Sequence, residues 1–271
     1  MRLKSQESFD AASERLEALI ASTTDDLKQM AIDMLFVVDT LGSNSQLRLT
    51  LTDPAADGDA KAKLVELVFG GSVSSDVLDF VKGVSRSYWS EVDDLVETIG
   101  RHAAIAVLAD AERVGILPEV AEELFSIEQF MMKERTLRDS FSNKLMPPAQ
   151  RIQLIEDVLE GSVHEHTMMI LRRMVSSERH PGIISSLRTH TRLAAERRDR
   201  LVAVVSAALP LTTAQVARIE RLLTSRYGKK IQVHVQIDPD IVGGMRIVVG
   251  DDVMDGTLAS RIDAVRRQLT D

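Results

Sequence analysis

The sequence matches itself when it is shifted by 90 residues. Leu64-Val65-Glu66 aligns with Leu154-Ile155-Glu156, and Gly71-Ser72-Val73 aligns with Gly161-Ser162-Val163, without a gap between the two blocks. The match weakens before Leu27, where we expect an insertion in the first helix. Two copies of this length are too few and too long for a solenoid array. We therefore predict two tandem helical bundles related by duplication, residues 1–100 and 101–200, each with its own core.

Apolar residues recur at helical spacing through the first two hundred residues. Leu16, Leu19 and Ile20, for example, fall on one face of a helix. Hydrophobic residues make up 44% of the chain but aromatic residues only 4%, so the cores must consist of aliphatic side chains and Met. Gly and Pro interrupt the pattern at intervals that suit short helices and tight connections. This part of the chain is predicted to be a run of helices.

The period changes near residue 200, where a C-terminal module of residues 201–271 is predicted. Residues 201–205 are rich in β-branched side chains, and residues 231–237 alternate between apolar and polar, so both are predicted strands. Thr212 and Gln215 have capping-box spacing and begin a helix that ends at Tyr227-Gly228. Residues 245–249 and 253–254 predict a strand pair, and a last helix is expected from Thr257 to Leu269. The predicted fold is mainly α, with a small α/β module of strand-helix-strand-strand-helix order.

Charge is distributed unevenly along the chain. The net charge is −8, and residues 1–100 contain 9 Lys and Arg against 18 Asp and Glu, whereas the remainder is nearly balanced. The asymmetry suggests a domain boundary near residue 100, and a negative field opposes binding to nucleic acid. The absence of Cys excludes disulfides and thiol nucleophiles. No stretch is long and apolar enough to predict a membrane span, and the charged N-terminal segment does not resemble a signal peptide.

Few residues suggest chemistry. His164 and His166 lack a third ligand at metal-site spacing, and no nucleophile motif is present. The only Trp, Trp89, is expected to be a core anchor or an interface residue. Eight Arg between Arg172 and Arg200 form a basic stretch without interleaved aromatics, which favours a solvated face or an acidic protein partner over nucleic acid. Turn and capping roles explain a group of aspartates better than cation binding does: Asp238, Asp240, Asp251, Asp252 and Asp255. We expect no metal, no cofactor and no catalysis.

Residues 237–258, IDPDIVGGMRIVVGDDVMDGTL, closely resemble the signature of the delta (oligomycin-sensitivity-conferring) subunit of F-type ATP synthases. The family pattern has an Asp-Pro turn, Gly-Gly before an alternating strand, a Gly-Asp turn, and Asp-Gly-Ser/Thr before a C-terminal helix. The residues expected to form these turns are Asp238, Pro239, Gly243, Gly244, Gly250, Asp255 and Gly256. The resemblance covers residues 101–271. Residues 1–100 are an additional copy of the helical domain, similar to a variant seen in some bacteria.

The resemblance implies a non-catalytic stator subunit of the peripheral stalk, held at the cytoplasmic face of the cell membrane only through the complex. Residues 101–200 would bind the alpha and beta subunits of the catalytic hexamer, and residues 201–271 would bind the b stator helices, so that proton-driven rotation is coupled to ATP synthesis. In this family the first and fifth helices form a groove for an alpha-subunit helix, here with walls at Ile105, Leu108, Ala109, Met168, Leu171 and Val175. The C-terminal helix would bind the stalk through Leu258, Ile262, Val265 and Leu269.

Two further hypotheses concern the remaining parts of the chain. The acidic residues 1–100 would lie along a basic stretch of a stator helix and brace the stalk. Alternatively, the whole chain would be a helical adaptor or regulator whose C-terminal module binds a small ligand at Gly243-Gly244 and the Asp-rich turns. A thermal-shift panel with nucleotides and divalent ions distinguishes the adaptor from the scaffold.

Overall fold

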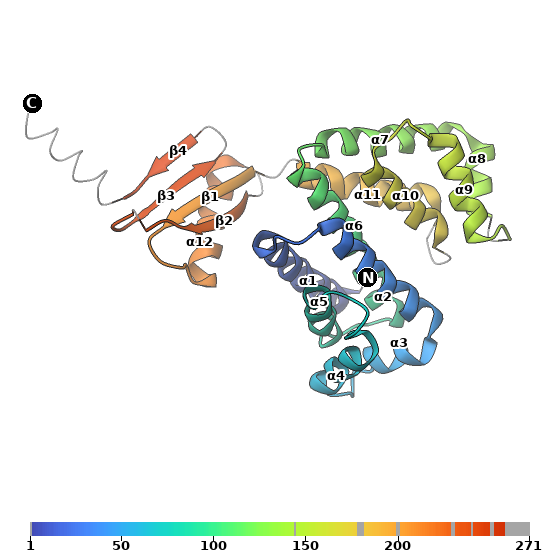
Figure 1. Cartoon of the computed structure of the whole chain (residues 1–271), viewed down its shortest axis with the longest axis horizontal. Coiled ribbons are helices and arrows are strands. Elements are labelled where there is room, and N and C mark those ends of the chain that lie inside the picture. The colour runs from blue at the N-terminus through green and yellow to red at the C-terminus, as the bar shows by residue number, and fades with distance from the viewer. Residues whose placement is uncertain are drawn as a thin grey trace, which may run out of the picture. The chain divides into compact units, whose positions relative to one another are not determined.

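The structure is a computed structural model that describes residues 2–143, 145–177, 182–198, 201–228, 231–239, 241–249 and 252–257. The chain divides into two compact units, Met1–Arg198 and Asp199–Asp271 (Figure 1). The first unit is helical, and the second is a small sheet with one helix in the described residues. The predicted fold class, mainly α with a small C-terminal α/β module, is confirmed.

The helical unit contains eleven helices within the described residues. Leu16, Met34, Leu95 and Leu124 are typical of its core, which is built from aliphatic side chains and Met. The helices are α1 (Leu3–Ser22), α2 (Leu27–Ser43), α3 (Ser45–Thr52), α4 (Gly58–Phe69), α5 (Ser75–Ser85), α6 (Val92–Arg113), α7 (Leu117–Lys133), α8 (Arg135–Ser142), α9 (Pro148–Leu159), α10 (Glu165–Ser176) and α11 (Ile183–Arg198).

The internal repeat is visible in the helix boundaries. Both ends of α2, α3 and α4 recur 90 residues later as the ends of α7, α8 and α9, and α5 recurs as α10 with one residue added. The ends of α1 recur within one residue as the ends of α6. The insertion expected in the first helix is therefore wrong: the boundaries of α1 and α6 align at a shift of 90 residues without a gap, although their sequences no longer match.

Helix α6 is shared by the two copies. By its position in the repeat it corresponds to α1, so it is the first helix of the second copy. It also packs on α2 in the way that α11 packs on α7, so it is the last helix of the first copy as well. Most of its residues are buried, and the buried side chains from Ala12 to Ala194 form one continuous core. The expectation of a separate core for each copy is wrong, because α6, which is buried on most of its sides, joins them. The division predicted between residues 100 and 101 falls inside α6.

A repeated hydrogen bond explains one part of the sequence match. Arg48 Nη1 donates to the carbonyl oxygens of Leu41 and Gly42, at 2.6 and 2.7 Å, where α2 ends. Arg138 Nη1 donates to the carbonyl oxygens of Met131 and Met132, at 3.4 and 3.3 Å, where α7 ends. A helix leaves its last carbonyl groups without partners, and a cation there is favoured by the helix dipole. The two Arg therefore align because each closes the same helix end.

The second unit is a four-stranded sheet in the order β2-β1-β3-β4. Its elements are β1 (Leu201–Ala207), α12 (Thr213–Tyr227), β2 (Ile231–Ile237), β3 (Met245–Val249) and β4 (Asp252–Asp255). β1 pairs parallel to β2, with Leu201 opposite Ile231, and α12 is the crossover that parallel strands require. β3 runs antiparallel to both β1 and β4. The predicted strands and the α12 helix are confirmed.

The ends of α12 follow the sequence signals. Thr212 Oγ1 accepts from the backbone N–H of Gln215, and the Gln215 side chain accepts from the backbone N–H of Thr212, so the predicted capping box is present. Gly228 closes the helix at φ 67°. A separate core lies beneath this helix, formed by Ala203, Val205, Ile219, Leu223, Ile231, Val233 and Val249. Of the last helix, predicted from Thr257 to Leu269, all residues after Thr257 lie outside the described residues.

Candidate functional site

The six residues predicted to wall a groove lie at the seam between α6 and α10, and all are buried. Ile105, Leu108 and Ala109 come from α6, and Met168, Leu171 and Val175 come from α10. None of their side chains is more than 8% exposed. They are therefore covered by the fold itself, and a partner helix would meet the margin of this seam before it met these side chains.

Ion pairs join the seam to α2 of the first copy. His166 Nε2 of α10 lies 2.8 Å from Asp110 Oδ2 of α6, and Lys28 Nζ of α2 lies 4.0 Å from the same oxygen. Further along, Arg173 of α10 pairs with Asp39 of α2. Helix α2 thus contacts the seam at two points separated by three turns. These contacts could not be predicted from the sequence, because no local sequence pattern indicates which charged residues of the two copies form pairs.

A groove of about 620 Å³ opens at one end of this seam. A side chain placed at Gly100 of α6 would project into space, since its Cβ would meet only Val38 Cγ2, at 3.9 Å. The charges at the groove are mixed, because Arg101 pairs with Glu97 and Arg173 pairs with Asp39. Met174 supplies apolar surface. The helices that line the groove are α2, α6, α10 and α11, together with Pro148 at the start of α9.

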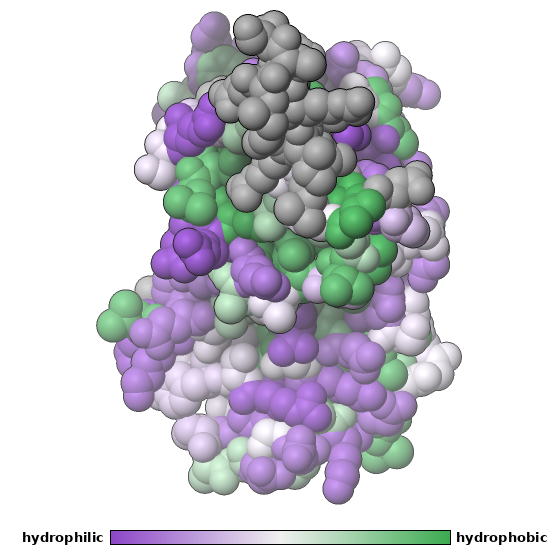
Figure 2. Space-filling view, turned by 90° about the vertical axis from the view of Figure 1, so that its left-hand side faces the viewer, coloured by the Kyte–Doolittle hydropathy of each residue, from purple (hydrophilic) through white to green (hydrophobic). Residues whose placement is uncertain are grey.

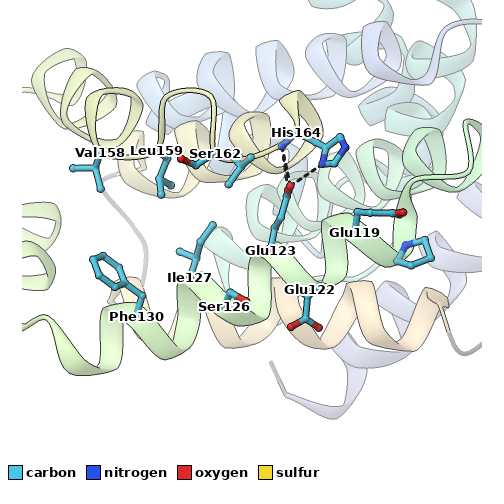
Figure 3. Close-up of a pocket in the computed structure, with 12 residues that line it drawn as sticks. Glu119, Glu122, Glu123, Ser126, Ile127, Phe130, Val158, Leu159, Ser162 and His164 are labelled. Carbon is cyan, nitrogen blue, oxygen red and sulfur yellow. Dashed lines mark hydrogen bonds and ion pairs between the residues drawn. The ribbon is translucent and has the colours of Figure 1, made fainter.

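A second groove, of about 740 Å³, lies between α7 and the connection from α9 to α10 (Figure 3). Glu123 of α7 reaches across it: Oε1 and Oε2 accept from the backbone N–H of His164 at 3.1 Å, and Oε1 lies 2.7 Å from His164 Nδ1. Ile127 and Phe130 continue the α7 wall, and Val158 and Leu159 form the opposite side. The lining is mainly apolar, with carboxylates at one end. Sequence reasoning missed this groove.

The predicted turn residues of the C-terminal module lie where β3 and β4 meet the chain around them. Gly244 has φ 81°, and a Cβ on it would lie 2.3 Å from the carbonyl oxygen of Gly256. Gly256 N–H donates to the Met245 carbonyl at 3.0 Å. Because the Gly256 backbone fills the space beside Gly244, the missing side chain serves close packing within the turn.

Aspartates complete these turns. Asp255 Oδ1 accepts from the backbone N–H of Thr257 at 3.0 Å, and this hydrogen bond holds the pKa of the Asp255 carboxyl below its usual value. The backbone N–H of Asp238, which precedes Pro239, donates to the Ala207 carbonyl at 3.0 Å. Gly243 directly precedes Gly244 before β3. Gly250 and the candidate cation ligands Asp240 and Asp251 lie outside the described residues.

The remaining candidate residues are engaged within the fold. His164 binds Glu123 of α7 whereas His166 binds Asp110 of α6, so the two imidazoles face different helices. Trp89 is 3% exposed, and its Nε1–H donates to the Val84 carbonyl. Much of the basic stretch is paired: Arg172 with Glu156 and Glu165, Arg173 with Asp39, Arg188 with Glu128, and Arg197 with Glu17 and Glu112.

The sheet unit exposes several large apolar side chains, and Figure 2 shows hydrophobic residues gathered on part of its surface. Val242, Val253 and Ile237 are 85%, 61% and 58% exposed. Exposed apolar surface of this kind is typical of a protein interface. The four residues of the predicted stalk-binding helix, Leu258, Ile262, Val265 and Leu269, lie outside the described residues. Among the helices that are described, none combines the length and the apolar character needed to cross a bilayer.

The fold is that of a two-unit protein, in which a helical unit is followed by a small α/β unit with exposed apolar side chains. Residues 99–269 match the family model of the ATP synthase delta (OSCP) subunit. The chain is 39% identical over 269 residues to an ATP synthase subunit delta of Beutenbergia cavernae, covering 99% of each chain. It is 37% identical over 265 residues to that of Streptomyces avermitilis, covering 98% of this chain and 97% of the relative. The chain therefore belongs to the ATP synthase delta (OSCP) family, whose members are structural subunits and not themselves catalytic.

The family model begins within α6, whereas both relatives match nearly the whole chain. The additional first copy is thus shared with these relatives. A chain in the cryo-EM structure of the Toxoplasma gondii mitochondrial ATP synthase hexamer also matches, with 17% identity, a TM-score of 0.28, and coverage of 62% of this chain and 95% of that one. A match of that quality supports no inference about the arrangement of the units.

Proposed function

We propose that this chain is the peripheral-stalk subunit that links the alpha and beta subunits of the catalytic hexamer to the b stator helices, at the cytoplasmic face of the cell membrane. Its work is mechanical: it resists the torque of rotation so that proton-driven rotation is coupled to ATP synthesis. The observation that supports this role best is the division into two units with separate cores, because a linker needs two independent attachment points.

The helical unit would attach to the hexamer along the seam of α6 and α10. The six buried residues of the seam position both helices, and the groove beside Gly100 offers the exposed margin on which an alpha-subunit helix would dock. Val38, Val96 and Met174 would receive apolar anchors, whereas Arg101 and Arg173 are already paired with Glu97 and Asp39 at this groove. Substituting Met168 or Leu171 would damage the core, so a test of docking must use the margin.

Calorimetry of the full chain with an N-terminal peptide of the alpha subunit tests this attachment. Gly100→Leu should fill the groove without a backbone clash and weaken binding at least tenfold, while the thermal midpoint is unchanged or higher. Gly71→Leu is the matched control, because a side chain there meets open space. Equal affinities of wild type and Gly100→Leu would rule out docking at this margin.

The sheet unit would hold the b helices through its exposed apolar residues. Ile237→Glu and Val253→Glu place charges at positions that are 58% and 61% exposed, so the fold should tolerate them. Each should weaken binding of a b-subunit helical segment while leaving the affinity for the alpha peptide unchanged. Ile237 lies on the β2 edge of the sheet and Val253 on the β4 edge, so the two variants test different edges. Loss of both affinities together would indicate a damaged fold, and retention of b binding by either variant would exclude the edge on which that residue lies.

The first copy would brace the stalk through an acidic stripe on α1. Glu7, Asp10 and Glu14 are exposed and follow helical spacing on one side of that helix. Deleting residues 1–100 would remove the first part of the shared helix α6, from Val92 to Gly100, so the test must use the full chain. Glu7→Gln, Asp10→Asn and Glu14→Gln together should weaken b binding and reduce its salt dependence. An unchanged salt dependence would contradict this role.

A further inference from the structure

The two copies differ at a position that lines the groove of the second copy. Phe36 of α2 lies against Phe69 in the first copy, with ring centroids 6.5 Å apart and an interplanar angle of 86°. Phe69 is completely buried. The corresponding residues of the second copy are Ser126 of α7 and Leu159 of α9, and Leu159 is only half-buried. The small Ser126 leaves open the space that an aromatic ring covers in the first copy.

This open space is the groove of about 740 Å³ between α7 and the α9–α10 connection. Its α7 wall extends from Pro118 to Phe130, which is about 18 Å at the rise of an α-helix. That length accommodates about three turns of a docked helix. The floor and sides are apolar, with Ile127 buried and Phe130 41% exposed. Glu123 is fixed by its bonds to His164, which keeps the two walls at their present separation.

The charged residues that line the groove determine which sign of charge a partner would need. Glu119 and Glu122 are exposed on α7 and line the groove. The equivalent positions of the first copy are Gln29 and Ile32, so these two carboxylates belong to the second copy alone. Carboxylates beside an apolar groove favour a cationic partner, because the rim attracts Lys or Arg while the floor receives an apolar side chain.

We propose that this groove binds a positively charged amphipathic helix of a partner protein, which inserts a Phe beside Ser126 as Phe36 is inserted in the first copy. Lys or Arg side chains one and two turns from that Phe meet Glu122 and Glu119, which lie one and two turns from Ser126 on α7. The proposal does not depend on the stalk role, since it rests on the comparison of the two copies and on the charge of the rim.

A synthetic peptide tests this site on the full chain. The probe is a fluorescein-labelled helical peptide of about four turns with one central Phe and Lys flanks, and binding is measured by fluorescence anisotropy. Replacing its Phe by Ala, or its Lys by Glu, should weaken binding at least tenfold. Ser126→Phe should also weaken binding at least tenfold, with an unchanged or higher thermal midpoint, and Ser126→Ala is the matched control with unchanged affinity.

A second variant keeps the test decisive if Ser126→Phe misfolds. Glu119→Lys with Glu122→Lys alters only exposed side chains and should reverse the preference, so that the Glu-flanked peptide binds more tightly than the Lys-flanked one. Methyl resonances of Val158 and Leu159 should shift on titration with the Lys-flanked peptide. The proposal is overturned if the wild-type chain does not prefer the Lys-flanked peptide, if a folded Ser126→Phe variant binds as tightly as wild type, or if these methyl resonances do not move.

Discussion

Glu123 closes the start of α10 through His164, whose backbone N–H lies 3.1 Å from both carboxylate oxygens. Ninety residues earlier, Asp33 Oδ2 accepts from the backbone N–H of Ser74 at 2.8 Å, at the start of α5. In both copies the second helix thus caps the fifth, although one carboxylate is Glu and the other Asp. The duplication has preserved a tertiary contact that a residue-by-residue comparison does not show.

Removing either carboxylate should destabilise the helical unit. Glu123→Ala and Asp33→Ala each leave a backbone N–H and a helix start without a partner, and we expect each to lower the free energy of unfolding by about 1–2 kcal/mol. Urea unfolding followed by circular dichroism measures the effect. Glu122→Ala, at an exposed neighbouring position, should change it by less than about 0.5 kcal/mol. An Asp33 or Glu123 variant as stable as this control would contradict the capping role.

His102 should make stability depend on pH. Its imidazole is completely buried on α6, with Nδ1 2.7 Å from the Thr98 carbonyl and Nε2 3.0 Å from Ser13 Oγ. Burial lowers the pKa of His102 from 6.5 to about 4. Between these values the unfolded chain binds a proton that the folded chain does not, so stability falls as the pH is lowered from 6.5 toward 4. At pH 5 the loss relative to pH 8 is about 2 kcal/mol.

His102→Gln removes this titration while keeping a side chain that forms hydrogen bonds. Urea unfolding at pH 8 and pH 5 should show a smaller loss for the variant than for wild type. A residual pH dependence is expected, because burial also lowers the pKa of His190. If wild type and variant lose the same stability between the two pH values, His102 does not titrate as described.

Arg151 is a buried cation whose removal should stabilise the chain. It is 1% exposed on α9, and neither its Nε nor its Nη1 has a hydrogen-bond partner in the part of the chain that is described. Arg151→Met retains most of the packing volume and removes an uncompensated charge, so we expect a gain of about 1–3 kcal/mol in the free energy of unfolding.

The repeat supplies a control for this prediction. Lys61 occupies the equivalent position in the first copy, where burial lowers its pKa and nearby Asp53 opposes the shift. Lys61→Met should therefore gain less than Arg151→Met, since Lys61 has a compensating carboxylate and can lose its proton. Thermal and urea unfolding of both variants measure the difference. A destabilised Arg151→Met variant would show that the guanidinium has a structural partner.

Gly244→Ala should destabilise the sheet unit more than Gly228→Ala. Both glycines have positive φ, 81° and 67°, which costs about 1–2 kcal/mol for an L-residue. A Cβ at Gly228 meets open space, whereas one at Gly244 lies 2.3 Å from the Gly256 carbonyl oxygen, a backbone atom that cannot move alone. Hydrogen exchange of the β3 and β4 amides should be faster in Gly244→Ala than in Gly228→Ala. Equal exchange in the two variants would rule out the close packing.

Local signals in the sequence determined the elements of this protein. Helical spacing of apolar residues, the Thr212–Gln215 capping box and the strand alternation of residues 231–237 each act over a few neighbours, and the structure has the corresponding helices and strands. The 90-residue match predicted the duplication, because homologous copies retain the residues that close helix ends, such as Arg48 and Arg138. The turn signature of the C-terminal module indicated the family for the same reason.

Only the tertiary structure decided how the copies are joined and which surfaces remain open. Helix α6 belongs to both copies because helices of both copies bury it. The spacing of apolar residues predicts that one side of a helix is buried, but it does not identify the helix that buries it. The groove at Ser126 exists because α7 and the α9–α10 connection approach each other, and Ser126 by itself is an ordinary surface residue. The sequence by itself therefore determined the helices, the repeat and the family, whereas contacts between distant residues decided the shared core and the open groove.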